Sequence, residues 1–175
     1  MWSEILKRVE NSKLFLKAKQ LDNLIIVENI KKKFHKNGIN TEKIITEGRS
    51  KTREEMLKKY NQIDIALDPF PYSGVTTSLE ANWMGVPLLT KKGNSFYSRI
   101  GTSINKNLDM EDWIANNEKD YYIKILKLTS DFNQLSRTRE CLINKVDEST
   151  LFDSSLFADN FNKILWKIWE KFITK

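Results

Sequence analysis

The chain has 175 residues, of which 40% are hydrophobic and 30% charged, a size and composition typical of one folded domain and not of a disordered chain. It contains no apolar stretch close to the roughly 20 residues that a membrane span needs, and charges are scattered through its first turns, so we expect neither a membrane segment nor a secretory signal. The net charge is +6, yet residues 1–60 alone, with 15 Lys and Arg against 8 Asp and Glu, carry +7, a bias that fits phosphate or nucleic-acid binding, or simply a solvated lysine-rich face.

Apolar periodicity in the first third of the chain alternates between helix and strand. Helical spacing over residues 2–9 is followed by a strand at 13–18 and by a helix over 24–36. Ile26, Ile30 and Phe34 share one face of that second helix, which leaves the lysines at 31–33 in water. A second strand is expected at 43–48. Thr52 and Glu55 then form a capping box ahead of a short helix.

The middle of the chain continues the alternation. The apolar run 63–70 is stopped by proline, residues 76–85 form a short helix that ends at Gly85, and a further strand is expected at 87–92. All three prolines and five of the six glycines fall between residues 48 and 101, so special backbone geometry is concentrated there. Strands that alternate with helices predict an α/β fold with a parallel sheet.

Beyond residue 94 the pattern is helical throughout, over 98–108, 121–128, 132–146 and 156–172. In the last of these segments six large apolar residues share one face, a stripe typical of a core and not of a cofactor site: Phe157, Phe161, Ile164, Leu165, Ile168 and Phe172. Cys141 stands at helical spacing with Leu135 and Leu142 and is expected to be a small buried residue, not a nucleophile.

Cysteine and histidine are too few for several kinds of site. With Cys141 as the single cysteine, the chain can form no internal disulfide and no cysteine-based metal site, so we expect a reducing, cytoplasmic location. With His35 as the single histidine, a multi-histidine zinc site is also excluded.

Residues 64–87 are the segment most suited to binding a ligand, because ligands of open parallel sheets bind where strands end and helices begin. Gly74 allows close approach of the backbone, while Thr76 and Thr77 open a helix with hydroxyls and free N–H groups. Such a helix start favours an anion, and a diphosphate fits well. Glu80, one turn further, is placed to accept hydrogen bonds from a ribose diol. The alternative is that the threonines only cap the helix and Glu80 offsets its dipole.

Several nucleotide-binding motifs are missing. The chain has no GxxxxGK[ST] loop and no GxGxxG sequence, which disfavours a kinase and a dehydrogenase. It also has no Asp-x-Asp pair to hold a divalent metal against a diphosphate. Charge neutralisation is therefore expected from helix ends and basic side chains, in metal-free chemistry.

The stretch IDIALDPFPYSGVTTSLEANWMGVPLLT resembles the O-GlcNAc transferase and SPINDLY family of protein glycosyltransferases, in particular bacterial members linked to tetratricopeptide repeats. SFYSRIGTSI, YIKILKLTSD, LFDSSLFADNF and the region of Trp169 follow in the family's order, so the resemblance covers nearly the whole chain. It implies a Rossmann-like domain over residues 1–175, the C-terminal nucleotide-binding half of a GT-B fold with a helical C-terminus. The first strand, the acceptor-binding half and an FNQLYK-like stretch with a phosphate-binding lysine are expected upstream.

On the family's pattern, Thr76 and Thr77 match the threonines that hold the donor diphosphate, and Gly74 shapes their loop. Glu80 matches an acidic residue that binds the ribose, and Arg53 a basic residue that contacts it.

Three further positions concern the base. The main chain near Ser50 and Lys51 matches the segment that contacts the nucleotide base in relatives. Met56 matches a position where many relatives have a histidine that packs against this base. Base stacking is therefore weaker here or differently made.

Three charged residues outside this pattern are weaker candidates. Asp64 and Asp68 flank an apolar strand, where an aspartate more naturally caps loop amides than serves as a catalytic base. Arg99 is near enough in sequence to approach the diphosphate, although an ion pair or loop hydrogen bonds explain it equally well. No catalytic residue is assigned.

The resemblance implies an inverting, metal-independent protein O-glycosyltransferase domain that transfers N-acetylglucosamine from UDP-GlcNAc to Ser and Thr hydroxyls. Its partners are then a nucleotide sugar and, through upstream regions, an acceptor protein, with no cofactor besides the UDP-sugar donor, no nucleic acid and no membrane. The isolated chain is expected to be inactive. One alternative is a non-catalytic nucleoside-diphosphate-binding module. Another is a basic nucleic-acid-binding domain, which is supported only by the positive charge of residues 1–60.

Overall fold

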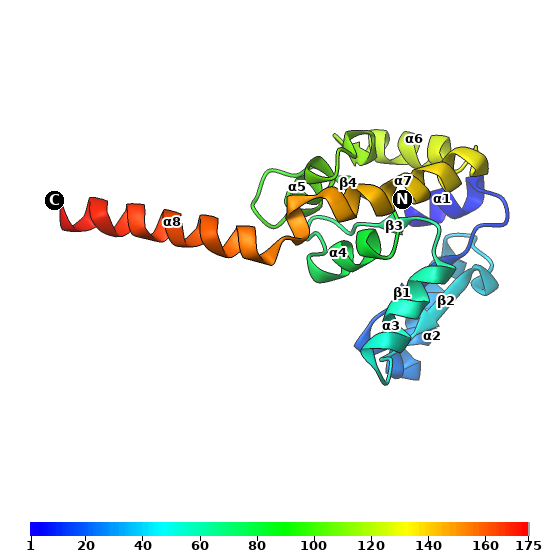
Figure 1. Cartoon of the computed structure of the whole chain (residues 1–175). Helices are drawn as coiled ribbons and strands as arrows, with labels where there is room; N and C mark the ends of the chain where they lie inside the picture. The colour runs from blue at the N-terminus through cyan, green and yellow to red at the C-terminus, as the bar shows by residue number, and fades with distance from the viewer. Residues whose placement is uncertain (175) are drawn as a thin grey trace.

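The computed structural model describes residues 1–174, which form two small parallel sheets with helices packed around them (Figure 1). The first sheet pairs β1 (Leu14–Lys17) with β2 (Ile44–Glu47), in a register that runs from Leu14 opposite Ile44 to Lys17 opposite Glu47. The second has the order β3 (Ala66–Leu67), β4 (Leu88–Lys91), β5 (Ile114–Ala115). The parallel α/β fold is as the sequence predicts.

The first sheet is stabilised by a small apolar cluster. Its buried members are Leu6, Leu14, Ile39 and Ile44. Leu6 comes from α1 (Trp2–Arg8), whereas α2 (Leu24–Lys36) adds the half-buried Ile30 and Phe34. The bounds predicted for α2 are confirmed. The lysines of its polar face largely follow the prediction too, since Lys32 and Lys33 are exposed and Lys31 is half-buried.

The second sheet lies within the larger core. Four helices contact it or one another: α4 (Thr76–Trp83), α5 (Ile100–Asn107), α6 (Glu118–Leu128) and α7 (Phe132–Glu148). Leu89 of β4 is fully buried in this cluster, and so are Tyr121 of α6 and Leu142 of α7. The two-residue β5 was not expected, because a strand so short shows no alternation of apolar and polar residues in the sequence.

The strands predicted to form a parallel sheet are divided between two sheets in the described residues. After β2 the chain passes through α3 (Arg53–Lys58) and enters β3, which pairs with β4 and not with β1 or β2. Strand periodicity predicts that strands exist, but it does not determine which edges meet.

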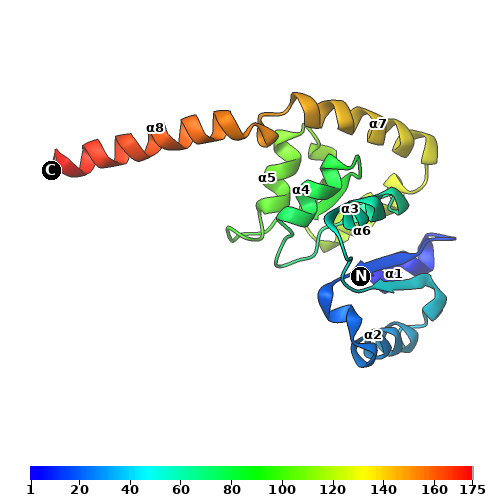
Figure 2. The ribbon, with the colours of Figure 1, turned by 60° about the horizontal axis from the view of Figure 1, so that its bottom comes forward.

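Two burial predictions for the C-terminal helices are wrong. Helix α8 (Ser154–Ile173) extends away from the rest of the molecule in both views (Figures 1 and 2), and its apolar stripe is exposed, with Phe157 at 68% and Phe172 at 71%. Cys141 is exposed on α7 because it lies about 100° around the helix from the buried Leu142. Helical periodicity defines a face; it does not supply the surface that covers it. Within residues 1–174 no helix has the length and apolar character required to cross a membrane.

Candidate functional site

The loop between β3 and α4 is organised by Asp68. This side chain is 2% exposed. One carboxylate oxygen accepts a hydrogen bond from the main-chain N–H of Gly74 at 2.8 Å, and the other accepts from the hydroxyl of Thr90 on β4 at 2.6 Å. Burial raises the pKa of Asp68, against the lowering effect of these hydrogen bonds. The prediction that Asp68 caps a loop amide is confirmed, and its two engaged oxygens make it a structural group beneath the loop.

Two glycines allow close packing around this carboxylate. A Cβ atom on Gly74 would lie 2.5 Å from the hydroxyl of Ser78 and 3.0 Å from that of Thr77. A Cβ atom on Gly101, near the start of α5, would collide with Asp68 and Thr90. Gly74 therefore lets the loop pack closely against α4, whereas a close approach of its main chain to a ligand stays a prediction.

Thr76 and Thr77 are the first two residues of α4, and both are exposed. The N-cap is Val75, and no side chain in the described part of the chain caps the helix. The alternative in which these threonines serve as caps is therefore wrong. The first N–H groups of a helix have no helical partner. This helix start is thus open, with two hydroxyls beside free amides and the positive end of the helix dipole.

Glu80 lies one turn further along α4 and is buried. Its Oε1 atom forms an ion pair with the guanidinium of Arg53 at 2.8 Å. Its Oε2 atom lies 3.3 Å from the hydroxyl of Tyr60, which is also 3.1 Å from the main-chain oxygen of Thr77. Arg53 and Glu80, 27 positions apart in the sequence, are therefore in contact, whereas Tyr60 was missed because no motif marks it.

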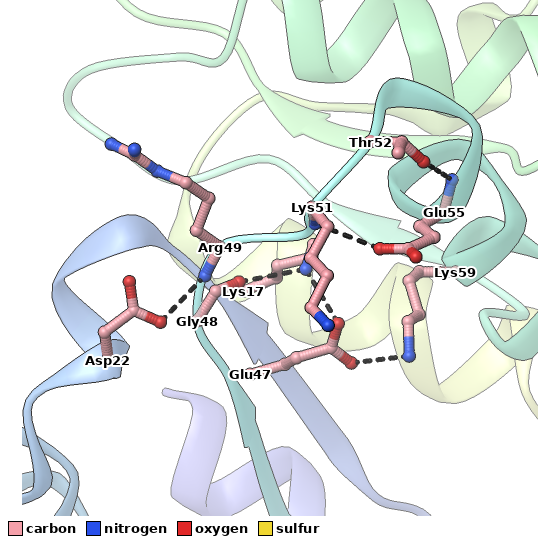
Figure 3. A network of polar contacts seen from close by, with 9 residues as sticks. All are labelled: Lys17, Asp22, Glu47, Gly48, Arg49, Lys51, Thr52, Glu55 and Lys59. Carbon is pink, nitrogen blue, oxygen red and sulfur yellow. Dashed lines mark hydrogen bonds and ion pairs between the residues drawn. The ribbon is translucent and has the colours of Figure 1, made fainter.

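The loop from Gly48 to Lys51 is held by polar contacts on both sides (Figure 3). On one side Lys17 donates to the main-chain oxygen of Gly48 at 2.9 Å, and the carboxylate of Asp22 accepts from the N–H of Arg49 at 3.0 Å. Lys17 also forms an ion pair with Glu47 at 2.8 Å. These contacts fix the loop against β1, β2 and the turn that follows β1.

On the other side the loop is held by the start of α3. The hydroxyl of Thr52 accepts from the N–H of Glu55 at 3.1 Å, as the capping box predicts, and the Glu55 carboxylate accepts from the N–H of Lys51 at 3.0 Å. Ser50 sits between these anchors, with a buried hydroxyl that has no hydrogen-bond partner among residues 1–174. Met56 is half-buried on α3. The positions expected to face the base thus lie on one braced loop and the helix after it.

The remaining candidates lie apart from this arrangement. Asp64 is exposed, and its nearest cation is Arg139 at 3.9 Å. Arg99 immediately precedes α5 with an exposed side chain, and no hydrogen bond or ion pair links it to α4 among residues 1–174. The same residues include no group of three or more His, Cys, Asp or Glu side chains that could hold a metal ion.

Residues 1–161 match the family model described as glycosyl transferase family 41. The chain belongs to this family. In the solved structure of a mutant of the Thermobaculum terrenum O-GlcNAc transferase, a segment superposes with a TM-score of 0.92 at 29% identity, covering 97% of this chain and 32% of that one. The family and the α/β fold of one half of a GT-B protein, both expected from the sequence, are confirmed.

Curated relatives in plants and animals carry the same segment. A tomato (Solanum lycopersicum) protein named probable UDP-N-acetylglucosamine–peptide N-acetylglucosaminyltransferase SPINDLY is 28% identical over 98% of this chain and 18% of its own length. The UDP-N-acetylglucosamine–peptide N-acetylglucosaminyltransferase of Caenorhabditis elegans is 26% identical over 98% of this chain and 15% of its own length. The family 41 chain described here therefore spans less than a fifth of these glycosyltransferases.

Proposed function

We propose that this family 41 chain is the nucleotide-sugar-binding domain of an inverting, metal-independent protein O-glycosyltransferase that takes N-acetylglucosamine from UDP-GlcNAc to Ser and Thr hydroxyls. The observation that carries the proposal is the uncapped start of α4, where exposed Thr76 and Thr77 adjoin the buried Glu80 and its partner Arg53. The names of the relatives, which specify UDP-N-acetylglucosamine and a peptide, support the donor and the acceptor class.

The open helix start suits the leaving group of such a transfer. As the acceptor hydroxyl attacks the anomeric carbon, the bond from that carbon to the diphosphate breaks and negative charge gathers on the phosphate oxygens. Free N–H groups, the helix dipole and the two threonine hydroxyls stabilise this charge without rearrangement. Arg53 adds a cation beside the ribose subsite, where Glu80 accepts hydrogen bonds from the sugar hydroxyls. This arrangement supplies charge neutralisation from the chain itself.

The proposal is tested by replacing both threonines with valine, which keeps their shape and removes their hydroxyls. Loss of hydrogen bonds to a charged ligand should weaken UDP binding by about 1 to 3 kcal/mol, measured by isothermal titration calorimetry. Thr150→Val serves as a control, because Thr150 is an exposed threonine in another short helix, η5 (Thr150–Phe152). Unchanged UDP affinity in the double variant would show that the hydroxyls of Thr76 and Thr77 do not hold the diphosphate.

A further inference from the structure

Tyr60 joins two parts of the site that come from different elements. It lies in the short helix η3 (Lys59–Gln62), and its hydroxyl is 3.1 Å from the main-chain oxygen of Thr77 and 3.3 Å from Oε2 of Glu80. Burial raises the pKa of Tyr60, and the negative charge of Glu80 raises it further. The hydroxyl therefore keeps its proton at neutral pH, and this one proton is shared between two acceptors, the main-chain oxygen of Thr77 and Oε2 of Glu80.

The two partners of the Glu80 carboxylate differ in rigidity. Arg53 holds Oε1 from a side chain that is 67% exposed, and such an ion pair restrains orientation weakly because solvent screens it and the long side chain is mobile. Tyr60 holds Oε2 from a half-buried ring with only two side-chain torsions. Each carboxylate oxygen can accept a second hydrogen bond, so both oxygens remain able to bind a ligand hydroxyl.

We infer that Tyr60 is a positioning residue that sets the preference for a ribose diol, by orienting the Glu80 carboxylate toward the 2′- and 3′-hydroxyls of a bound nucleoside diphosphate. The inference rests on the proposed function, in which Glu80 faces the ribose. A fixed acceptor discriminates strongly against a sugar that lacks a hydroxyl, because the carboxylate oxygen is then left without its donor. Without the Tyr60 hydroxyl, the carboxylate turns toward Arg53 and this discrimination is lost.

The test compares UDP with 2′-deoxy-UDP by calorimetry in the wild-type chain and in Tyr60→Phe. The variant should bind UDP about tenfold more weakly and 2′-deoxy-UDP almost as before, so the preference for UDP collapses. Tyr122→Phe is the matched control, since Tyr122 is a half-buried tyrosine on α6. This control variant should prefer UDP over 2′-deoxy-UDP by the same factor as the wild type. Equal losses for both nucleotides in Tyr60→Phe, or an unchanged preference, would overturn the inference.

A second variant separates action through Glu80 from a general structural effect. In the Glu80→Gln background, removing the Tyr60 hydroxyl should change the preference by less than about twofold, because residues that act through one another are not additive. A full effect of Tyr60→Phe in that background contradicts the positioning role. Failure of the wild-type chain to bind UDP overturns the proposed function itself, an outcome distinct from UDP binding whose preference does not depend on Tyr60.

Discussion

Asp64 and Asp68 lie four positions apart beside one apolar strand of the sequence, yet they differ in burial and in the contacts they make. Asp68 is 2% exposed and holds the loop through Gly74 and Thr90, whereas Asp64 is exposed on the surface. Sequence reasoning predicts the loop-capping role because a short carboxylate after a strand accepts loop amides. It does not predict which aspartate is buried, since burial depends on the packing of β4, whose Thr90 donates a hydrogen bond to Asp68.

Replacing Asp68 with alanine removes both accepting oxygens. The main-chain N–H of Gly74 and the hydroxyl of Thr90 then lose their acceptor in a buried site, so the free energy of unfolding should fall by about 1 to 3 kcal/mol. UDP affinity should fall as well, because the loop that leads into α4 is no longer fixed. Urea denaturation and calorimetry measure the two effects. A variant as stable as the wild type would contradict the role given to Asp68.

Glu47 is the residue whose contribution to stability depends most clearly on pH. Its carboxylate forms ion pairs with Lys17 at 2.8 Å and Lys59 at 2.9 Å, and the hydrogen bond from Lys17 lowers its pKa, with a smaller contribution from Lys59. A lowered folded-state pKa means that the stabilisation is complete above the unfolded value of about 4.3 and is lost as the pH falls through the folded value.

Glu47→Gln should therefore lower the free energy of unfolding by on the order of 1 kcal/mol at pH 7. The difference from the wild type should shrink as the pH falls below about 4. Denaturant unfolding of both proteins at several pH values measures this difference in the free energy of unfolding. Protonation of Asp68 affects both proteins equally and therefore drops out of the difference. A difference that stays constant down to pH 3 would show that the ion pairs do not stabilise the fold.

At the scale of elements, the sequence predicts the helices best. The bounds of α2 follow from apolar spacing and the start of α4 from the threonine pair, and the structure adds that Asn23 caps α2. The two-residue strands β3 and β5 are too short to carry a pattern, and the placement of α8 depends on a surface that its own periodicity does not define. The role of Tyr60 could not be predicted from the sequence, because its contacts with Thr77 and Glu80 form only when η3 and α4 come together in the fold.

Helix α8 makes no buried contribution to the core, since all its described side chains are exposed or nearly so. A chain that ends after residue 152 should therefore unfold within about 2 °C of the full chain, by differential scanning calorimetry, because no core area is lost. Ending the chain after residue 131 also removes α7, with the buried Leu135, Leu142 and Val146, and should abolish cooperative unfolding. A large drop in melting temperature for the first truncation would show that α8 packs on the body.

As a whole molecule, the chain corresponds to one half of a GT-B fold. It spans 18% of the tomato relative and 32% of the solved transferase. Transfer also requires an acceptor hydroxyl held in line with the anomeric carbon, and orientation of this kind is worth roughly 7 to 11 kcal/mol. In our proposal Arg53, Thr76, Thr77 and Glu80 hold the donor nucleotide, and none of them positions an acceptor.

The isolated chain should therefore label no protein when it is supplied with radiolabelled UDP-GlcNAc and a cell lysate, while a full-length family 41 enzyme in the same assay serves as the positive control. Slow hydrolysis of the sugar nucleotide is the most that a donor site alone should support. Labelling comparable to that of the control would mean that Arg53, Thr76, Thr77 and Glu80 belong to a complete active site.

We propose that the donor nucleotide binds at the start of α4, with its ribose beside Glu80. Amide chemical-shift mapping of the ¹⁵N-labelled chain, titrated with UDP in the presence of EDTA, tests it most directly. We predict that the shifts concentrate in the loop from Gly74 to Thr77, in the rest of the first turn of α4, and in residues 48–53, and that they persist without divalent metal. Shifts confined to other elements would rule out a nucleotide site at the start of α4, and shifts that need Mg²⁺ would rule out metal-independent binding.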